Sequence, residues 1–142
     1  MNSLKIAYLS FEYPPDTAIG GIATYTEQIS KLMAAKGHHV EVFTSSRQRE
    51  SLNEIYAPNL VAHRIHTTNR NQFHEIILNC FSERHQQVQF HLIESPEYSC
   101  EGLSIRQAFP QLPMVIRFHT PSLNERPRRE LSPTGQCFVK EL

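Results

Sequence analysis

Three short polar segments carry the residues best suited to bind or transform a ligand: 12–21, 94–98 and 119–121. The first ends in the pair Gly20-Gly21, which precedes a stretch with helical periodicity. Free backbone N–H groups at such a helix start can hold an anion. The other two segments supply carboxylates and an imidazole, which can exchange hydrogen bonds or protons with hydroxyl groups. The three segments together predict a site for a polar, anion-bearing ligand.

The residues on either side of the first segment predict the strand and the helix that position it. Residues 5–11 read KIAYLSF, an apolar run typical of a parallel strand buried on both faces. Pro14 and Pro15 prevent the strand from continuing. We expect Gly20 and Gly21 to turn the chain with positive φ and to let a ligand approach the backbone. The helix that follows is predicted to bury one stripe made of Ile22, Tyr25, Ile29, Leu32 and Met33.

The rest of the chain alternates between strand and helix patterns. Strands are predicted over 40–44, 60–65, 90–93 and 114–118, and helices over 71–87 and 100–109. Residues 45–57 are polar and are predicted to be irregular. The pattern predicts an α/β fold: a Rossmann-like three-layer sandwich with a mostly parallel sheet of about five strands. We place this domain at 1–122 and expect 123–142 to be a divergent or poorly ordered tail.

The fold brings the polar segments together. Each follows a predicted strand, and in a doubly wound sheet ligands bind outside the carboxyl ends of the strands. Plainer interpretations exist for each residue taken alone. Glu94 and Glu97 suit the start of a helix, where acidic side chains are favourable. A single histidine such as His119 is often a structural residue, so the convergence of the segments carries the argument.

Composition excludes several classes of function. The 14 Lys and Arg residues balance 14 Asp and Glu residues, which argues against a nucleic-acid partner. No apolar run approaches the ~20 residues of a membrane span, and no signal peptide is evident. The three cysteines, Cys80, Cys100 and Cys137, are predicted to be reduced thiols. We therefore expect a cytoplasmic protein, and leave open an attachment to a membrane surface.

Other chemical motifs are weak or absent. His63 and His66 would point to opposite faces of a strand, so no metal site is predicted. The glycine loop is neither the G-x-G-x-x-G fingerprint nor a P-loop. No G-x-S-x-G elbow marks a nucleophile. A plain dehydrogenase, NTPase or serine hydrolase is thus disfavoured.

Taken in order, the chain resembles the N-terminal half of a glycosyltransferase of family 4, a retaining group with the two-domain GT-B architecture. The resemblance covers roughly residues 5–122. It rests on Pro14-Pro15 with Gly20-Gly21-Ile22 and Tyr25, on Gly37-His38-His39-Val40 with Val42 and Thr44, on Glu94-Ser95-Pro96-Glu97-Tyr98, on Glu101-Gly102-Leu103 and on Arg117-Phe118-His119-Thr120-Pro121.

The resemblance implies a transferase that moves a sugar, with retention, from a nucleotide-diphosphate sugar to an acceptor. It places Gly20 and Gly21 against the donor diphosphate and His119, the expected catalytic residue, at the reacting centre. The acceptor side would be formed by Glu94, Glu97 and Tyr25. The implied partners are the nucleotide-sugar donor and a glycan, lipid or small-molecule acceptor, with no metal and no further cofactor.

The family's donor half, with its E-x7-E motif, has no counterpart after Leu142. We therefore expect a truncated chain that lacks the C-terminal nucleotide-sugar domain, is inactive alone and could need that half as a partner. One alternative is a non-catalytic half-domain that binds a saccharide or a protein. A weaker one is a nucleotide-binding Rossmann domain of another kind.

Overall fold

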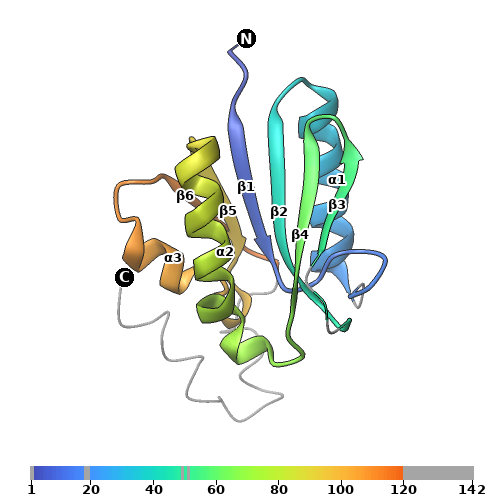
Figure 1. Ribbon diagram of the computed structural model, residues 1–142, viewed down its shortest axis with the longest axis vertical. Helices are drawn as coiled ribbons and strands as arrows, with labels where there is room; N and C mark the ends of the chain where they lie inside the picture. The colour runs from blue at the N-terminus through green and yellow to red at the C-terminus, as the bar shows by residue number, and fades with distance from the viewer. Residues whose placement is uncertain (1, 18–19, 49, 51, 120–142) are drawn as a thin grey trace.

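Strands and helices alternate along the computed structural model, which describes residues 2–17, 20–48, 50 and 52–119 (Figure 1). The elements are β1 (Lys5–Ser10), α1 (Gly21–Ala35), β2 (His39–Ser46), β3 (Leu52–Ala57), β4 (Leu60–His66), the 3-10 turn η1 (Arg70–Gln72), α2 (Phe73–Val88), β5 (Leu92–Pro96), the 3-10 turn η2 (Tyr98–Cys100), α3 (Leu103–Ala108) and β6 (Met114–Arg117). The predicted tail at 123–142 and Cys137 lie outside the described residues.

One sheet of six strands has the order β3-β4-β2-β1-β5-β6. All neighbouring strands pair in parallel except β3, which runs antiparallel to β4 at one edge. The chain starts in the middle of the sheet, builds outward through β2 and β4, and then crosses back to β5 and β6. This is the doubly wound topology that places ligands at the carboxyl ends of the strands. The predicted α/β sandwich with a mostly parallel sheet is confirmed.

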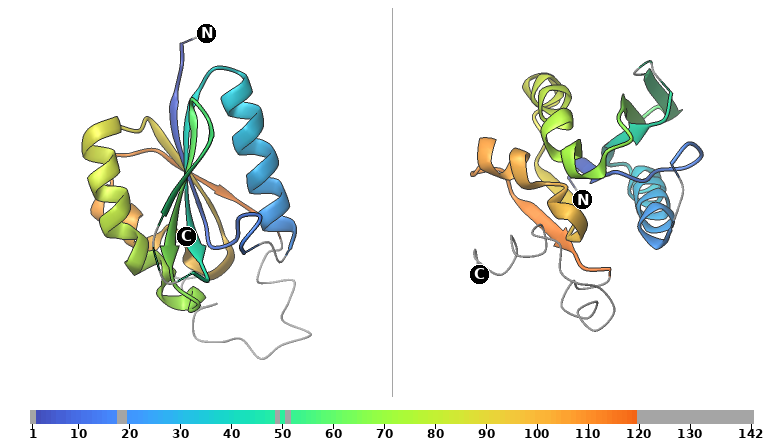
Figure 2. Two further views of the ribbon diagram at one scale, coloured as in Figure 1. Left: turned by 45° about the vertical axis from the view of Figure 1, so that its right-hand side comes forward. Right: turned by 90° about the horizontal axis from the view of Figure 1, so that it is seen from below.

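Helices cover both faces of the sheet, with α1 on one side and α2 and α3 on the other (Figure 2). The core on the α2 side is aromatic: Phe11, Phe43, Phe73, Phe81 and Phe90 pack there with aliphatic residues such as Leu9, Ile77 and Ile93. The core on the α1 side consists of Ile6, Tyr8, Tyr13, Ala34, Val40, Val42, Leu60 and Ala62. The central strands are buried on both faces, as their apolar runs predicted.

Residues 45–57, predicted to be irregular, contain the end of β2 and all of β3, so this prediction was wrong. Strand β3 buries little apolar surface, and Ile55 is 76% exposed. It is held by its ladder with β4 and by polar pairs, such as Glu54 with Arg64 and Asn53 with His63. An edge strand of this kind lacks the apolar signal on which strand prediction depends.

Helix α1 buries the predicted stripe only in part: Ile29 and Met33 pack against the core on the α1 side but are only partly buried. Its buried residues are Ala23, Thr26, Ser30 and Ala34, whereas Leu32 is 51% exposed. Small side chains allow the helix to lie close to the sheet, and the Tyr13 ring fills the space beside it. The Ser30 hydroxyl lies 3.1 Å from the Tyr13 hydroxyl, so its burial costs no hydrogen bond. The larger side chains of the predicted stripe lie beside these four buried residues. The Tyr25 side chain points towards the carboxyl ends of β5 and β6.

Gly102, which precedes α3, packs against the sheet without room for a side chain. A Cβ atom there would lie 3.0 Å from the Ser95 hydroxyl oxygen and 3.1 Å from the Met114 sulfur. We expect Gly102→Ala to lower the free energy of unfolding by about 1–3 kcal/mol through overpacking, measured by urea denaturation. Gln107→Ala, on the exposed side of α3, is the control. Equal stability of both variants would contradict the tight packing.

Candidate functional site

A shallow pocket opens at the carboxyl ends of β1, β5 and β6, beside the second turn of α1. Four of its side chains carry the chemistry: Tyr25 from α1, Glu94 from β5, Arg117 from β6 and His119 just after β6. The complete lining is Tyr8, Leu9, Tyr25, Thr26, Glu94, Ser95, Pro96, Arg117 and His119. Three of the residues predicted from the sequence therefore meet in one place.

Tyr25 and Glu94 form the centre of the pocket. The Tyr25 hydroxyl donates to Glu94 Oε1 at 2.6 Å. Burial and the Glu94 carboxylate raise the pKa of Tyr25 to about 12, so its hydroxyl stays a hydrogen-bond donor at neutral pH. The hydrogen bonds of Glu94 to described residues all use Oε1. Its second oxygen is therefore available to accept a hydrogen bond from a ligand hydroxyl.

Arg117 and His119 complete the pocket from the β6 side. The Arg117 guanidinium lies 5.1 Å from the centroid of the Tyr25 ring, and its Nε is 3.5 Å from Glu94 Oε1. The side chain is 48% exposed, so this ion pair contributes little stability. The His119 imidazole meets the Tyr25 ring edge-to-face, with 5.0 Å between centroids. The pocket thus offers a carboxylate, a guanidinium and an imidazole side by side.

Glu97 lies behind the pocket. Its side chain is buried, and both carboxylate oxygens lie 3.1 Å from the backbone N–H of His119. Its own backbone N–H donates to the carbonyl of Arg117 at 3.2 Å. Glu97 therefore holds the segment that carries His119. Binding of an acceptor by Glu97 stays a prediction.

The glycine pair lies at the start of α1, but with a different backbone from the one predicted. Gly20 is extended, with φ −162°, and Gly21 is the first helical residue, so the predicted positive φ at this pair was wrong. No side-chain hydrogen bond caps this end of α1 within the described residues. A Cβ atom at Gly21 would meet no atom of the described part of the chain within 4 Å. Gly21 and Tyr25 are four residues apart, so both face the pocket side of the helix, about 6 Å apart along its axis.

A second charged cluster anchors the start of the loop after β1. Arg70 donates to the carboxylates of Glu12 and Glu101, the latter at 2.6 Å, and its guanidinium lies 4.6 Å from the Phe11 ring centroid. Glu101 is fully buried and also accepts the Phe11 N–H at 2.8 Å. Burial raises the pKa of Glu101 to about 8 despite the guanidinium beside it. The cluster joins β1 to η1 and the start of α3.

Sequence reasoning did not single out Arg117 for the pocket, nor Glu12, Arg70 and Glu101 as a cluster. Arg117 is the penultimate residue of a predicted strand. A charged side chain at such a position is usually exposed to solvent, so it does not indicate a site. Arg70 and Glu101 are 31 positions apart, and only the three-dimensional fold brings them together. One signal was available: residues at the carboxyl ends of parallel strands are candidates by position alone.

The described residues contain no group of three or more His, Cys, Asp or Glu side chains that could hold a metal ion. Cys80 carries a free thiol. Within the same residues, no helix is long and apolar enough to cross a membrane.

Comparison with solved structures identifies the class of fold. A sucrose-phosphate synthase from Thermosynechococcus elongatus superposes with a TM-score of 0.73 at 19% identity, over 89% of this chain and 36% of that chain. The catalytic domain of starch synthase IV from Arabidopsis thaliana, bound to ADP and acarbose, gives a TM-score of 0.55 at 12% identity, over 82% of this chain and 34% of that chain. The fold is that of one Rossmann-like half of a GT-B glycosyltransferase.

The sequence places the chain within this class. The model of Glycosyltransferase Family 4 matches residues 19–138, so the chain belongs to that family. It spans about a third of the two synthase chains above. A second structure of the T. elongatus synthase, of a part of that enzyme, aligns over 96% of this chain and 81% of its own length, with a TM-score of 0.62 at 16% identity. No curated protein sequence matches the chain significantly.

Proposed function

We propose that this chain is the acceptor-side domain of a retaining glycosyltransferase that moves a sugar from a nucleotide-diphosphate sugar to an acceptor hydroxyl. The observation that carries the proposal is the meeting of Tyr25, Glu94, Arg117 and His119 at the carboxyl ends of β5 and β6 in a member of family 4. Carboxylate and imidazole groups at this position suit the recognition of sugar hydroxyls. The Oε2 oxygen of Glu94, which accepts no hydrogen bond from the described residues, and the ring of His119 are the groups we assign to the reacting sugars.

Charge develops at two places during glycosyl transfer: positive at the anomeric carbon and negative on the leaving diphosphate. We assign the diphosphate to the N–H groups at the start of α1, where the helix dipole favours an anion. The open space in front of Gly21, on the same helix face as Tyr25, supports this assignment. The leaving phosphate can then help to deprotonate the acceptor, so no protein nucleophile is required. The nucleotide itself would bind to a C-terminal half.

The donor side of the proposal is tested by Gly21→Val. The Cβ atom of the valine would meet no atom of the described residues within 4 Å, so we expect the variant to fold normally. We expect binding of a nucleotide diphosphate to weaken by tenfold or more, because the side chain occupies the approach to the N–H groups. Isothermal titration of wild type and variant measures this effect, with Gln28→Val, an exposed residue two turns further along α1, as the control. If wild type and Gly21→Val bind the nucleotide diphosphate with equal affinity, the diphosphate does not bind at this end of α1.

One experiment distinguishes a transferase from the non-catalytic alternative, because the two predict different results. The chain is mixed with nucleotide sugars and candidate acceptors, alone and with a separately expressed C-terminal donor half, and products are followed by mass spectrometry. We expect transfer only when the donor half is present. Saccharide binding without transfer under either condition would favour a binding half-domain.

A further inference from the structure

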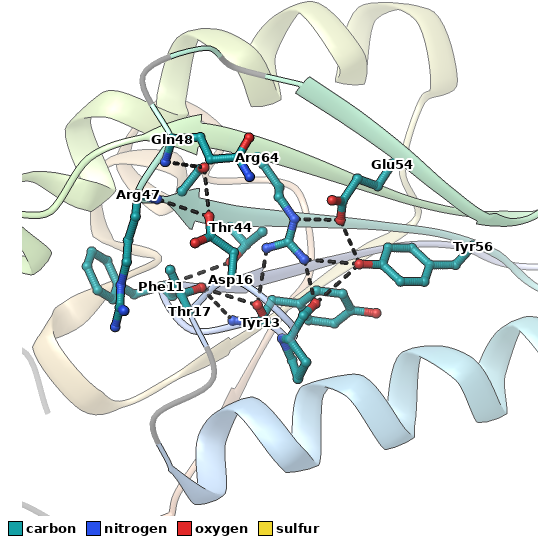
Figure 3. Close-up of polar contacts among 12 residues, drawn as sticks. Phe11, Tyr13, Asp16, Thr17, Thr44, Arg47, Gln48, Glu54, Tyr56 and Arg64 are labelled. Carbon is teal, nitrogen blue, oxygen red and sulfur yellow. Dashed lines mark hydrogen bonds and ion pairs between the residues drawn. The ribbon is translucent and has the colours of Figure 1, made fainter.

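The β3–β4 hairpin supports the loop that leads from β1 into α1 (Figure 3). Arg64 of β4 is buried, with only 1% of its side chain exposed, and donates to two backbone carbonyls of this loop. Its Nη1 lies 3.1 Å from the Tyr13 carbonyl and its Nη2 lies 2.5 Å from the Pro14 carbonyl. A guanidinium bound to two successive carbonyls fixes the path of the backbone itself.

Two residues of β3 hold the guanidinium in this position. Its Nε donates to Glu54 at 2.5 Å, and its Nη2 lies 3.0 Å from the Tyr56 hydroxyl. The Tyr56 hydroxyl also lies 2.6 Å from Glu54 and 3.2 Å from the Pro14 carbonyl. Each polar group of Arg64 thus has a partner. We call Arg64, Glu54 and Tyr56 the hairpin clamp.

Other contacts tie the same loop to β2 and α1. Asp16 accepts the Ser46 hydroxyl at 2.7 Å and the Arg47 N–H at 3.0 Å. The Tyr13 ring is fully buried, and its hydroxyl meets Ser30 of α1 at 3.1 Å. The loop is therefore fixed against β2 and against the third turn of α1, the helix at whose start the diphosphate is assigned.

Strand β3 contributes little to the hydrophobic core, so it is held mainly by its ladder with β4 and by these polar contacts. We propose that Arg64 is a positioning residue of the donor site: through the hairpin clamp it holds the loop so that the N–H groups at the start of α1 are pre-organised for a diphosphate. The inference rests on the proposed function. It adds β3 and β4, which lie outside the acceptor pocket, to the substrate-binding machinery. Fixed donors bind an anion more tightly than mobile ones because no ordering is needed on binding.

The test uses the whole chain, 15N-labelled, with inorganic pyrophosphate as the probe. Amide shifts of Gly20, Gly21 and Ile22 report binding, and hydrogen exchange of residues 12–17 reports the order of the loop. Tyr56→Phe removes one hydroxyl of the clamp, and Arg64→Met removes the guanidinium with its N–H donors. Ile55→Thr, on the exposed side of β3, is the matched control.

We expect Tyr56→Phe to weaken pyrophosphate binding about three- to tenfold, the equivalent of one lost hydrogen bond. Arg64→Met should weaken it further, and both variants should exchange the loop amides faster than wild type. The amides of β1 and β2 should keep their protection, which a general loss of stability would not allow. The control variant Ile55→Thr should have the same pyrophosphate affinity and the same loop exchange rates as wild type. If Arg64→Met does not fold, Tyr56→Phe decides the question.

Two outcomes would overturn the inference, and they can be told apart. If wild type binds pyrophosphate at these amides and both variants bind it equally well, the clamp is a structural feature only and the donor site stands. If pyrophosphate shifts no amide at the start of α1 in wild type, the assignment of the donor diphosphate fails, and the positioning role fails with it.

Discussion

Replacing Arg84 by Met is expected to destabilise the protein by about 3 kcal/mol, the lower end of the range for removing one partner of a buried ion pair. Arg84 of α2 donates to both oxygens of Glu41, at 2.6 and 2.9 Å, and Glu41 is fully buried in β2. The variant would leave a buried carboxylate whose remaining side-chain partners among residues 2–119, as far as these are described, are His63 and His39, at 2.6 and 2.9 Å. These two contacts, together with the 30% exposure of the Arg84 side chain, are the reason for the lower figure.

Urea denaturation at pH 7 measures the effect, with Lys31→Met as the control. Lys31 forms an exposed pair with Glu27 one helical turn away, which contributes about 0.5 kcal/mol or less. A loss at Arg84 no larger than that of the control would show that the buried network does not stabilise the fold.

The same network predicts a pH dependence. Burial by itself would raise the pKa of Glu41, but the hydrogen bonds from Arg84, His63 and His39 outweigh it and hold this pKa well below its ordinary value. A depressed pKa in the folded state contributes stability above the unfolded value of 4.5, and this contribution is lost as the pH falls below it. The stability difference between wild type and Arg84→Met should therefore narrow from pH 5 towards pH 3. A constant difference would contradict the role of Glu41.

His119→Ala is expected to have the largest effect on catalysis. In a transferase assembled from this chain and a donor half, we expect kcat to fall by about 10²-fold or more, as is usual when a group at the reacting centre is removed. The KM for the acceptor should change little, because Glu94 and Tyr25 remain. Phe118→Ala is the control, since Phe118 is 59% exposed and lies outside the pocket lining. An unchanged kcat for His119→Ala would contradict the assignment of His119 to the reacting centre.

The sequence was sufficient to predict most of the fold because the central strands are apolar on both faces. β3 could not be predicted in this way, since its partners Arg64 and His63 lie on the next strand and its own side chains are half exposed. The buried face of α1 was misassigned because closeness to the sheet selected Ala23 and Ser30 over larger residues. Helical periodicity alone does not distinguish two adjacent stripes when both contain apolar side chains.

The pocket was predictable in part. The strand-end rule brought Glu94 and His119 to one edge of the sheet, whereas the assignment of Tyr25 to the site came from the family resemblance, since its helix spacing had placed it in the buried stripe. The contacts that support them depend on pairs far apart in sequence, such as Arg70 with Glu101 and Arg64 with Tyr13. Charged residues of this kind look like surface positions until the fold buries them.

The most direct test of the proposed site is an amide chemical-shift map of the 15N-labelled chain, titrated separately with a series of neutral saccharides and a series of nucleotide-diphosphate sugars. A saccharide that binds should shift the amides of Tyr25, Ser95, Arg117 and His119. A nucleotide-diphosphate sugar should shift those of Gly20, Gly21 and Ile22. Shifts that gather at the opposite, amino-terminal ends of the strands, or no shifts with any ligand in either series, would contradict a glycosyl-transfer site at the carboxyl ends of β5 and β6.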